Sequence, residues 1–182
     1  MASPYLVPVA RLVRDEPAEL AVSFDAPFDE AHEFAPRGPA ESDVDADAAV
    51  HVDLRVESYA GGLRARGTVR APWHGVCRRC STVVAGELVI AVAERFVRDP
   101  TPDDDAYAFD GEVVDLAPLV HDAVLLELPI APLCAEDCAG LCPTCGVDRN
   151  EQSCECREER DPRWSTLDAL RARPRAAGAE KP

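Results

Sequence analysis

The chain has 182 residues, of which 47% are hydrophobic and 29% charged, a balance typical of a globular protein. Its formal net charge is −15, so it lacks the dense basic surface that non-specific nucleic-acid binding requires. No run approaches the ~18 consecutive apolar residues of a membrane span, and the N-terminus lacks the pattern of a secretory signal. We therefore expect an acidic cytoplasmic protein, in a reducing compartment where structural disulfides are rare.

The N-terminal third shows only weak patterns. Two apolar patches between residues 5 and 24, YLVPVARLV and ELAVSF, predict strands. From Ala26 to Ala48, prolines and acidic residues replace any periodic pattern, which indicates an irregular connection. The acidic runs ESDVDAD (Glu41 to Asp47) and PTPDDD (Pro100 to Asp105) are typical of solvated loops.

Strict alternation of apolar and polar residues predicts an antiparallel meander in the middle of the chain. VHVDLRVE (50–57) places its valines and its leucine on one face, and LRARGTVR (63–70) alternates in the same way. Gly61-Gly62 can form the tight hairpin turn between them. A third alternating run extends from Val83 to Phe96. We expect three neighbouring strands with one buried face.

After the second acidic loop, the spacing of the apolar residues changes from the alternation of a strand to the period of a helix. VVDLAPLVHDAVLLELP predicts a helix near residues 115–128, with Asp115 as its cap, Pro118 in its first turn and Pro129 beyond its end. Its apolar stripe contains Leu116, Leu119, Val120, Ala123 and Val124. A second helix is expected in DPRWSTLDALRA (161–172), followed by a frayed tail.

These elements predict an α+β fold: an antiparallel β meander or sheet with one or two packed helices and a C-terminal cysteine-rich, zinc-binding segment. We expect a β-rich domain with acidic loops over residues 1–133. The zinc segment and the C-terminal helix are expected over 134–172, attached to the first domain, and the frayed tail over 173–182.

All the cysteines lie in short groups, and six of the eight fall between residues 134 and 156. CPTCG, which begins at Cys142, is the pattern of a zinc knuckle: two thiolates separated by two residues bind one ion, and the glycine permits a tight turn. Two closed sites of four thiolates each, holding two structural zinc ions, are the simplest arrangement. Disulfides, an iron–sulfur cluster, mononuclear iron and free thiols are less favoured alternatives. The expected metal ligands are Cys77, Cys80, Cys134, Cys138, Cys142, Cys145, Cys154 and Cys156.

The spacing allows the cysteines to be divided in two ways. The favoured division makes one site of Cys142, Cys145, Cys154 and Cys156, and the other four cysteines then connect the tail to the sheet. The rival division moves Cys138 into the tail site and frees one of its neighbours.

Signs of catalysis are absent from the sequence. It contains no G-x-S-x-G, Walker or H-E-x-x-H motif, and VCRRCS (76–81) lies between strands rather than in the βαβ setting of a redox C-x-x-C. Arg78 and Arg79 would lower the pKa of the neighbouring thiols, which favours redox chemistry and metal binding equally. His74, near Cys77, is interpreted as a surface residue. We expect no enzyme, no catalytic residue and no small-molecule substrate.

One local feature suits contact with phosphate or a partner: the arginines Arg64, Arg66, Arg70, Arg78 and Arg79. If Gly61-Gly62 forms the turn, however, Arg66 faces Glu57 and Arg70 faces Asp53, as ordinary cross-strand ion pairs. Contact with RNA and simple ion pairing both stay open at this point.

Four motifs occur in the order and spacing of the YceD-like family. They are GTVRAPWHGVCRRCS, GEVVDLAPLVHDAVLLELPIAPLC, CAGLCPTCGVDRN and DPRWSTLDAL. Over roughly residues 50–172 the chain resembles this family of large ribosomal RNA subunit accumulation proteins, once labelled a domain of unknown function, and its composition resembles an actinobacterial member. The resemblance implies a factor without known catalytic activity that promotes accumulation or maturation of large-subunit ribosomal RNA and assembly of the large ribosomal subunit. It carries the metal-binding suggestion onto Cys77, Cys80, Cys134, Cys138, Cys142 and Cys145.

The partners implied are the pre-ribosomal large subunit, through ribosomal RNA or a basic ribosomal protein. Two alternatives belong to other classes of protein. One is a cytosolic zinc or thiol protein that acts in redox chemistry or metal handling. The other is a scaffold that binds one basic ribosomal protein and never touches RNA.

Overall fold

The computed structural model describes residues 3–15, 18–28, 42–156 and 163. The chain divides into two compact units, Met1–Cys138 and Ala139–Pro182, each described by itself below. The division falls within the cysteine-rich segment. Among the described residues, no helix is long and apolar enough to cross a membrane.

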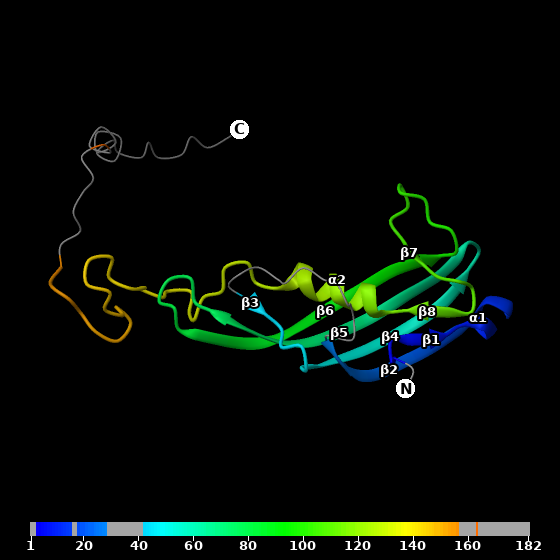
Figure 1. Cartoon of the computed structure of the whole chain (residues 1–182), viewed down its shortest axis with the longest axis horizontal. Coiled ribbons are helices and arrows are strands. Elements are labelled where there is room, and N and C mark those ends of the chain that lie inside the picture. The colour runs from blue at the N-terminus through cyan, green and yellow to red at the C-terminus, as the bar shows by residue number, and fades with distance from the viewer. Residues whose placement is uncertain (1–2, 16–17, 29–41, 157–162, 164–182) are drawn as a thin grey trace, which may run out of the picture. The chain divides into compact units, whose positions relative to one another are not determined.

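The first unit is built on a six-stranded sheet (Figure 1). Its strand order is β2-β4-β5-β6-β7, and β3 pairs with the far end of β5. All pairs are antiparallel except β6 with β7. The long central strands confirm the predicted meander. The strands are β2 (Glu19–Pro27), β3 (Ser42–Asp43), β4 (Ala49–Tyr59), β5 (Gly62–Val76), β6 (Val83–Val97) and β7 (Tyr107–Ala108).

The patch YLVPVARLV was expected to be a strand, and this expectation is only partly right. β1 covers Leu6–Pro8 and pairs antiparallel with β8 (Val113–Asp115), but the chain then turns into the short helix α1 (Ala10–Arg14). The backbone N–H of Val13 donates to the carbonyl of Val9, and Leu12 is buried. Apolar residues at positions i, i+3 and i+4 suit a helical turn as well as a strand, so this short patch was ambiguous.

In the hairpin between β4 and β5, the turn lies one residue earlier than expected, which shifts the pairing of the two strands by two residues. Tyr59 pairs with Gly62, so the turn is Ala60-Gly61 rather than Gly61-Gly62. A Cβ on Gly62 would collide with the carbonyl oxygen of Phe96, so close contact with β6 requires glycine at this strand position. A shift of two residues leaves the same side chains facing inward, and the alternation therefore could not detect it.

The second helix, α2 (Ala117–Glu127), packs against β5 and β6. The N-cap residue is Leu116 rather than the predicted Asp115, but the carboxylate of Asp115 still accepts the backbone N–H of Ala117 at 2.9 Å, and Pro118 lies in the first turn. The helix ends just before Leu128 and Pro129. Its predicted apolar stripe is buried except for Ala123, which is half-buried. The helix predicted in DPRWSTLDALRA lies outside the described residues, apart from Arg163.

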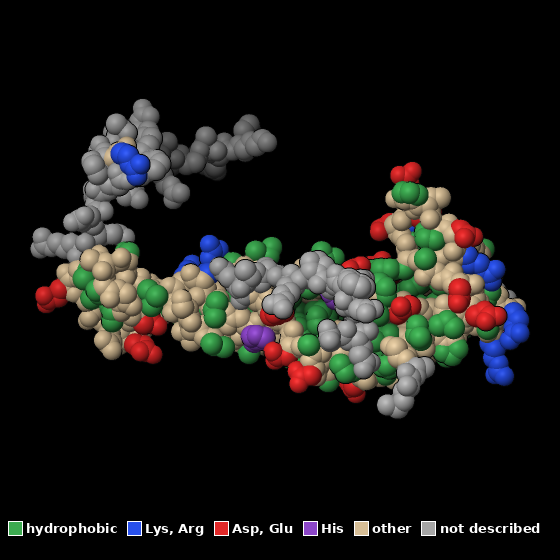
Figure 2. Space-filling model, viewed as in Figure 1, with side chains coloured by type: hydrophobic (Ala, Val, Ile, Leu, Met, Phe, Trp, Pro, Cys, Tyr) green, Lys and Arg blue, Asp and Glu red, His purple; other side chains and the backbone are tan. Residues whose placement is uncertain are grey.

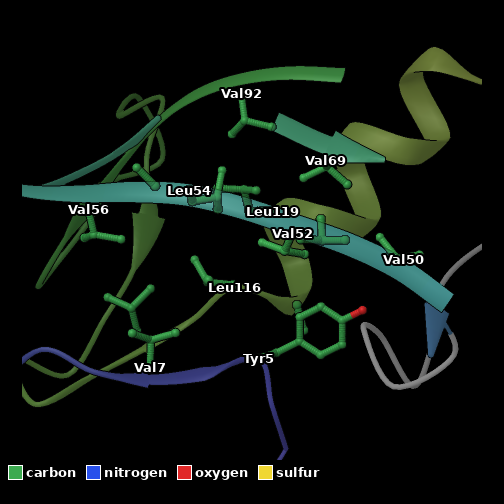
Figure 3. Close-up of a cluster of buried hydrophobic side chains, with 14 of the residues drawn as sticks. Tyr5, Val7, Val50, Val52, Leu54, Val56, Val69, Val92, Leu116 and Leu119 are labelled. Atoms are coloured by element: carbon green, nitrogen blue, oxygen red, sulfur yellow. The ribbon is translucent and has the colours of Figure 1, made fainter. Parts of the chain in front are cut away.

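The core of the first unit lies between the inner face of the sheet, the β1–β8 pair and α2 (Figure 3). Alternation in β4 places Val50, Val52, Leu54 and Val56 inside, each at most 2% exposed. Burying a side chain of this size stabilises the fold by about 1.5–3 kcal/mol. The α+β fold class predicted from the sequence is confirmed.

Candidate metal centres

The first group of cysteines, called here the sheet cluster, contains Cys77, Cys80, Cys134 and Cys138. Its four Sγ atoms all lie within 4.8 Å of one another. Two of the distances are 3.8 Å, from Cys77 to Cys138, and 3.6 Å, from Cys80 to Cys134. A tetrahedron with metal–sulfur bonds of about 2.3 Å has sulfur–sulfur edges of about 3.8 Å, whereas a disulfide needs about 2.05 Å. The sulfur positions therefore suit one tetrahedral ion rather than disulfides.

The second group, called here the tail cluster, contains Cys142, Cys145, Cys154 and Cys156. These Sγ atoms also lie within 4.8 Å of one another, and all four residues belong to the second unit. The sulfur positions agree with the favoured division of the cysteines, because Cys138 lies with the sheet cluster. Each group presents only thiol sulfurs, the soft donor set that suits zinc or iron–sulfur chemistry.

The tail cluster is built on the turn predicted from CPTCG. The backbone N–H of Cys142 donates to the carbonyl of Val147, and the N–H of Gly146 donates back to the carbonyl of Cys142, both at 2.8 Å. Gly146 has φ +74°, which a residue without Cβ adopts at no steric cost. The turn directs the backbone N–H groups of Thr144 and Cys145 at the sulfur of Cys142.

The sheet cluster uses a turn of the same design, which the sequence reading missed. The N–H of Cys77 donates to the carbonyl of Thr82, and the N–H of Ser81 donates to the carbonyl of Cys77, both at 2.8 Å. Ser81 occupies the place of Gly146 and is the one non-glycine residue with positive φ, +61°, in the part of the chain that the structure describes. Serine here concealed the likeness between VCRRCS and CPTCG.

The two knuckles favour the thiolate form of their first cysteine. Burial raises the pKa of the Cys77 thiol, but backbone hydrogen bonds to its sulfur, the largest from Cys134, outweigh this and lower the pKa to about 6. Backbone hydrogen bonds from Cys145 and Thr144 likewise lower the pKa of Cys142 to about 6. N–H groups directed at a sulfur stabilise its negative charge, which is the form that binds a metal.

At least one further thiol in each cluster has a raised pKa. Hydrogen bonding with the sulfurs of Cys138 and Cys80 raises the pKa of Cys134 to about 12. In the tail cluster the sulfur of Cys145 has the same effect on Cys156, whose pKa is raised to about 12. Four thiols packed this closely cannot all ionise together unless a cation offsets their charge. The residues present therefore fit a divalent metal ion in each cluster.

Arg79 has a structural role in the sheet cluster. Its guanidinium donates to the backbone carbonyls of Glu136 and Cys138, both at 3.0 Å. The backbone N–H of Arg78 donates to the carbonyl of Pro132, also at 3.0 Å. These bonds join the β5–β6 hairpin to the segment that follows α2, so the fold itself uses a residue that the sequence suggested for partner binding.

The second unit contains two polar residues whose structural role was not predicted from the sequence. Asp148 accepts hydrogen bonds from the backbone N–H and the side-chain amide of Asn150, and Asn150 accepts the N–H of Ala139 at 2.8 Å. A β-bridge joins Leu141 to Asp148. The pattern Asp-x-Asn after a knuckle is a signal for such a side-chain-stabilised turn.

The other predicted arginines lie on the outer face of β5, and the observed register corrects their expected partners. Arg66 faces Arg55, not Glu57, and Arg70 faces His51, not Asp53. Arg70 instead lies 3.5 Å from Glu87 of β6.

The register also brings together arginines that are distant in sequence. Arg64 lies opposite Arg95, and its guanidinium lies over the ring of Tyr59, 5.5 Å from the centroid. Arg55 pairs with Glu19 at 2.8 Å. Arg55 and Arg95 therefore lie beside the arginines on the outer face of β5. The sequence alone gave no signal for them, because only strand pairing places them there.

His74, the histidine nearest to the knuckle in sequence, lies outside both clusters. Its Nδ1 atom is 3.8 Å from a carboxylate oxygen of Asp45. Among the described residues, His74 belongs to neither group of metal ligands.

Taken together, fold and site define an antiparallel-sheet protein with two closed four-cysteine clusters. Comparison with known proteins gives the family. The family model "Large ribosomal RNA subunit accumulation protein YceD" matches residues 65–171. The chain belongs to this family.

Relatives extend the comparison beyond the family model. An uncharacterized protein of Mycobacterium tuberculosis is 38% identical over 173 residues, which cover 92% of this chain and 81% of the relative. The uncharacterized protein YlbN of Bacillus subtilis is 27% identical over 79% of this chain and 86% of its own length. "Large ribosomal RNA subunit accumulation protein YCED homolog 1, chloroplastic" of Arabidopsis thaliana is 37% identical over 37% of this chain and 22% of its own length. No solved structure gives a significant match.

Proposed function

We propose that this protein promotes accumulation and maturation of large-subunit ribosomal RNA, and so assembly of the large ribosomal subunit, without catalysing a reaction. The observation that carries the proposal is membership of the family, whose description names large ribosomal RNA subunit accumulation. The described residues add two closed cysteine clusters that suit structural metal and leave no position open for a substrate. We place this activity in the cytoplasm.

We further propose that each cluster holds one structural zinc ion. The sheet cluster would then connect residues 134–138 to the β5–β6 hairpin, and the tail cluster would organise the second unit. Four thiolates complete the coordination of zinc, so the metal would shape the surface rather than act on a substrate.

Contact with the precursor particle can follow two routes. The outer face of β5, together with the hairpin tip, offers Arg64, Arg66, Arg70 and Arg78 to RNA phosphates, whereas the guanidinium of Arg79 already donates to backbone carbonyls of the sheet cluster. Alternatively, the acidic loop that contains Asp103, Asp104 and Asp105 attracts a basic ribosomal protein. The net charge of −15 favours a local contact over general affinity for RNA.

The test is deletion of the gene, with the ratio of mature large-subunit to small-subunit ribosomal RNA as the readout. We expect the ratio to fall and precursor particles to accumulate, and a copy of the wild-type gene to restore both. Changing Arg64, Arg66, Arg70 and Arg78 to Gln tests the RNA route, and changing Asp103, Asp104 and Asp105 to Asn tests the protein route. Arg79 is left intact because it supports the sheet cluster. An unchanged ratio in the deletion strain would refute the proposal.

A second candidate function is zinc or thiol redox chemistry. One observation favours it: Cys145 is exposed and Cys154 and Cys156 are half-buried, so an oxidant can reach the tail cluster. Release of one zinc ion per chain by mild peroxide, reversed by a thiol reductant, would support this function, particularly if the ribosomal RNA ratio were normal in the deletion strain.

A further inference from the structure

Strand β6 has a long edge without a partner. It pairs with β5 from Val83 to Phe96, but on its other side β7 pairs only at Phe96 and Val97. Within residues 3–15, 18–28 and 42–156, no strand pairs with the stretch Val83–Ala93 on that side; this stretch is called here the β6 edge. Backbone N–H and C=O groups at alternate positions of an edge strand point away from the sheet and can bond to another chain.

The β6 edge lacks the features that usually protect an exposed strand. Such strands carry lysine, proline or a bulge. The sequence VVAGELVIAVA contains no lysine or proline, its one charged residue is Glu87, and its register with β5 is continuous. Val83 is 71% exposed and Val89 is 58% exposed. A long, regular and apolar edge of this kind is a template for an added strand.

The other edge strand of the sheet is different. β2 is nine residues long, and its exposed positions include Glu19 and Asp25, with Pro27 at its end. Charges and proline discourage strand addition. The argument for an added strand therefore applies to β6 and not to β2.

Charge indicates what kind of chain would bind. α2, which packs against β6, contains two acidic residues and neither lysine nor arginine. The loop after β6 contains Asp103, Asp104 and Asp105, and Figure 2 shows acidic side chains along this face of the first unit. On the outer face of the sheet, Arg66 and Arg70 of β5 lie opposite Ala93 and Val89, and Arg70 approaches Glu87. Arg95 donates to the carbonyl of Asp105. The acidic residues therefore lie on α2 and in the loop after β6, and they attract a basic segment to that side of the edge.

We propose that the β6 edge binds an extended, basic polypeptide segment, which joins the sheet as an additional antiparallel or parallel strand. The main chain of that segment bonds to the free backbone groups of β6. Side chains alternate along a strand, so its apolar residues lie on the outer face beside Val83 and Val89, while its lysines and arginines lie on the face that α2 covers, toward the acidic residues of that helix. This inference does not depend on the proposed function, because it concerns only backbone groups and charge.

The probe is a synthetic ten-residue peptide of alternating basic residues and valine, labelled for fluorescence anisotropy and titrated with the full-length chain. Two control peptides separate charge from strand pairing. The first replaces each basic residue with Glu, and it should not bind. The second keeps the sequence but carries N-methyl groups at two adjacent central residues, which removes donors from both edges of the peptide. It should bind at least about tenfold more weakly than the parent.

Two double variants test the location of the site. Ala85→Lys with Ala91→Lys adds positive charge on exposed positions of β6, and Ala21→Lys with Ser23→Lys makes the same charge change on β2. We expect about tenfold weaker binding for the β6 variant and a change within about twofold for the β2 variant. Hydrogen exchange locates the site on the unaltered chain, without any substitution. The amides between Val83 and Ala93 should gain protection when the peptide binds.

Several results would overturn the proposal. They are absence of binding by the basic peptide, equal binding by the N-methylated peptide, and loss of binding in the β2 variant instead of the β6 variant. Light scattering of the chain alone adds another test, because a dimer that the β6 variant dissociates would show that a second copy occupies the edge. If a single-stranded RNA oligonucleotide bound and protected the same amides, the partner of the edge would be a nucleic acid rather than a polypeptide, and the proposal would fail.

Discussion

Loss of one ligand from the sheet cluster should release the segment after α2 while leaving the sheet folded. The change is Cys80→Ser, at a buried position of the β5–β6 hairpin. The segment concerned is Pro129–Cys138, which contributes Cys134 and Cys138 to the cluster. A serine hydroxyl is a poor ligand for zinc compared with a thiolate, so the sheet cluster should lose its ion.

The hydrogen bonds of the segment indicate why it would depend on a metal ion in the sheet cluster. Few described hydrogen bonds hold it to the rest of the first unit: Ser42 to Pro129, the N–H of Arg78 to Pro132, and the two bonds from Arg79. Each contributes about 0.5–1.5 kcal/mol, so together they contribute only a few kcal/mol. Ordering the ten backbone residues of this segment costs on the order of 10–20 kcal/mol. Binding of a structural zinc ion would supply about 10–16 kcal/mol, enough to close this difference.

The assay combines metal analysis with hydrogen exchange and limited proteolysis. The unaltered chain should contain two zinc ions, and the Cys80→Ser variant one. Exchange and cleavage between residues 130 and 138 should accelerate by at least about tenfold, while the amides of β4 and β5 stay protected by the core. Cys145→Ser is the matched control, because it removes a ligand from the tail cluster and should leave residues 130–138 protected.

One outcome would refute this reasoning directly. If Cys80→Ser contained one zinc ion and residues 130–138 nevertheless kept their full protection, contacts other than the metal would be holding the segment. Loss of protection throughout the sheet would mean instead that the cluster supports the whole first unit.

Three further predictions concern the backbone and pH. Gly67→Ala should destabilise the first unit by several kcal/mol, since a Cβ there would collide with the backbone carbonyl of Asp53; thermal unfolding measures the loss. Ser81→Gly should leave zinc content and thermal stability unchanged or higher, whereas Ser81→Val should lower both, because a β-branched residue opposes φ +61°. Backbone hydrogen bonds, first that from Val113, lower the pKa of Asp110 below 3.8, so its carboxylate stabilises the fold above that pH and this contribution disappears as the pH falls further. The difference in unfolding midpoint between the unaltered chain and Asp110→Ala should therefore be constant above about pH 5 and shrink below about pH 4.

The sequence by itself determined the kind of structure and the kind of site. Alternation over β4, β5 and β6 predicted the meander, because a strand with one buried face must repeat every two residues. Asp115 and Pro118 located the start of α2. The spacing of Cys142 and Cys145 predicted a metal knuckle, since two thiolates and a turn residue form a local unit that needs no distant contact. Features that depend only on residues close together in the sequence could therefore be predicted.

Only the tertiary structure determined the features that require contact between segments distant in the sequence. Register placed Arg66 opposite Arg55 and Arg64 opposite Arg95, because a shift of two residues changes cross-strand partners while preserving the alternation that sequence can show. The grouping of Cys138 with Cys77 likewise required the hairpin and the segment after α2 to meet in space. An open strand edge such as that of β6 has no sequence signature at all, because an edge is defined by which neighbours a strand lacks.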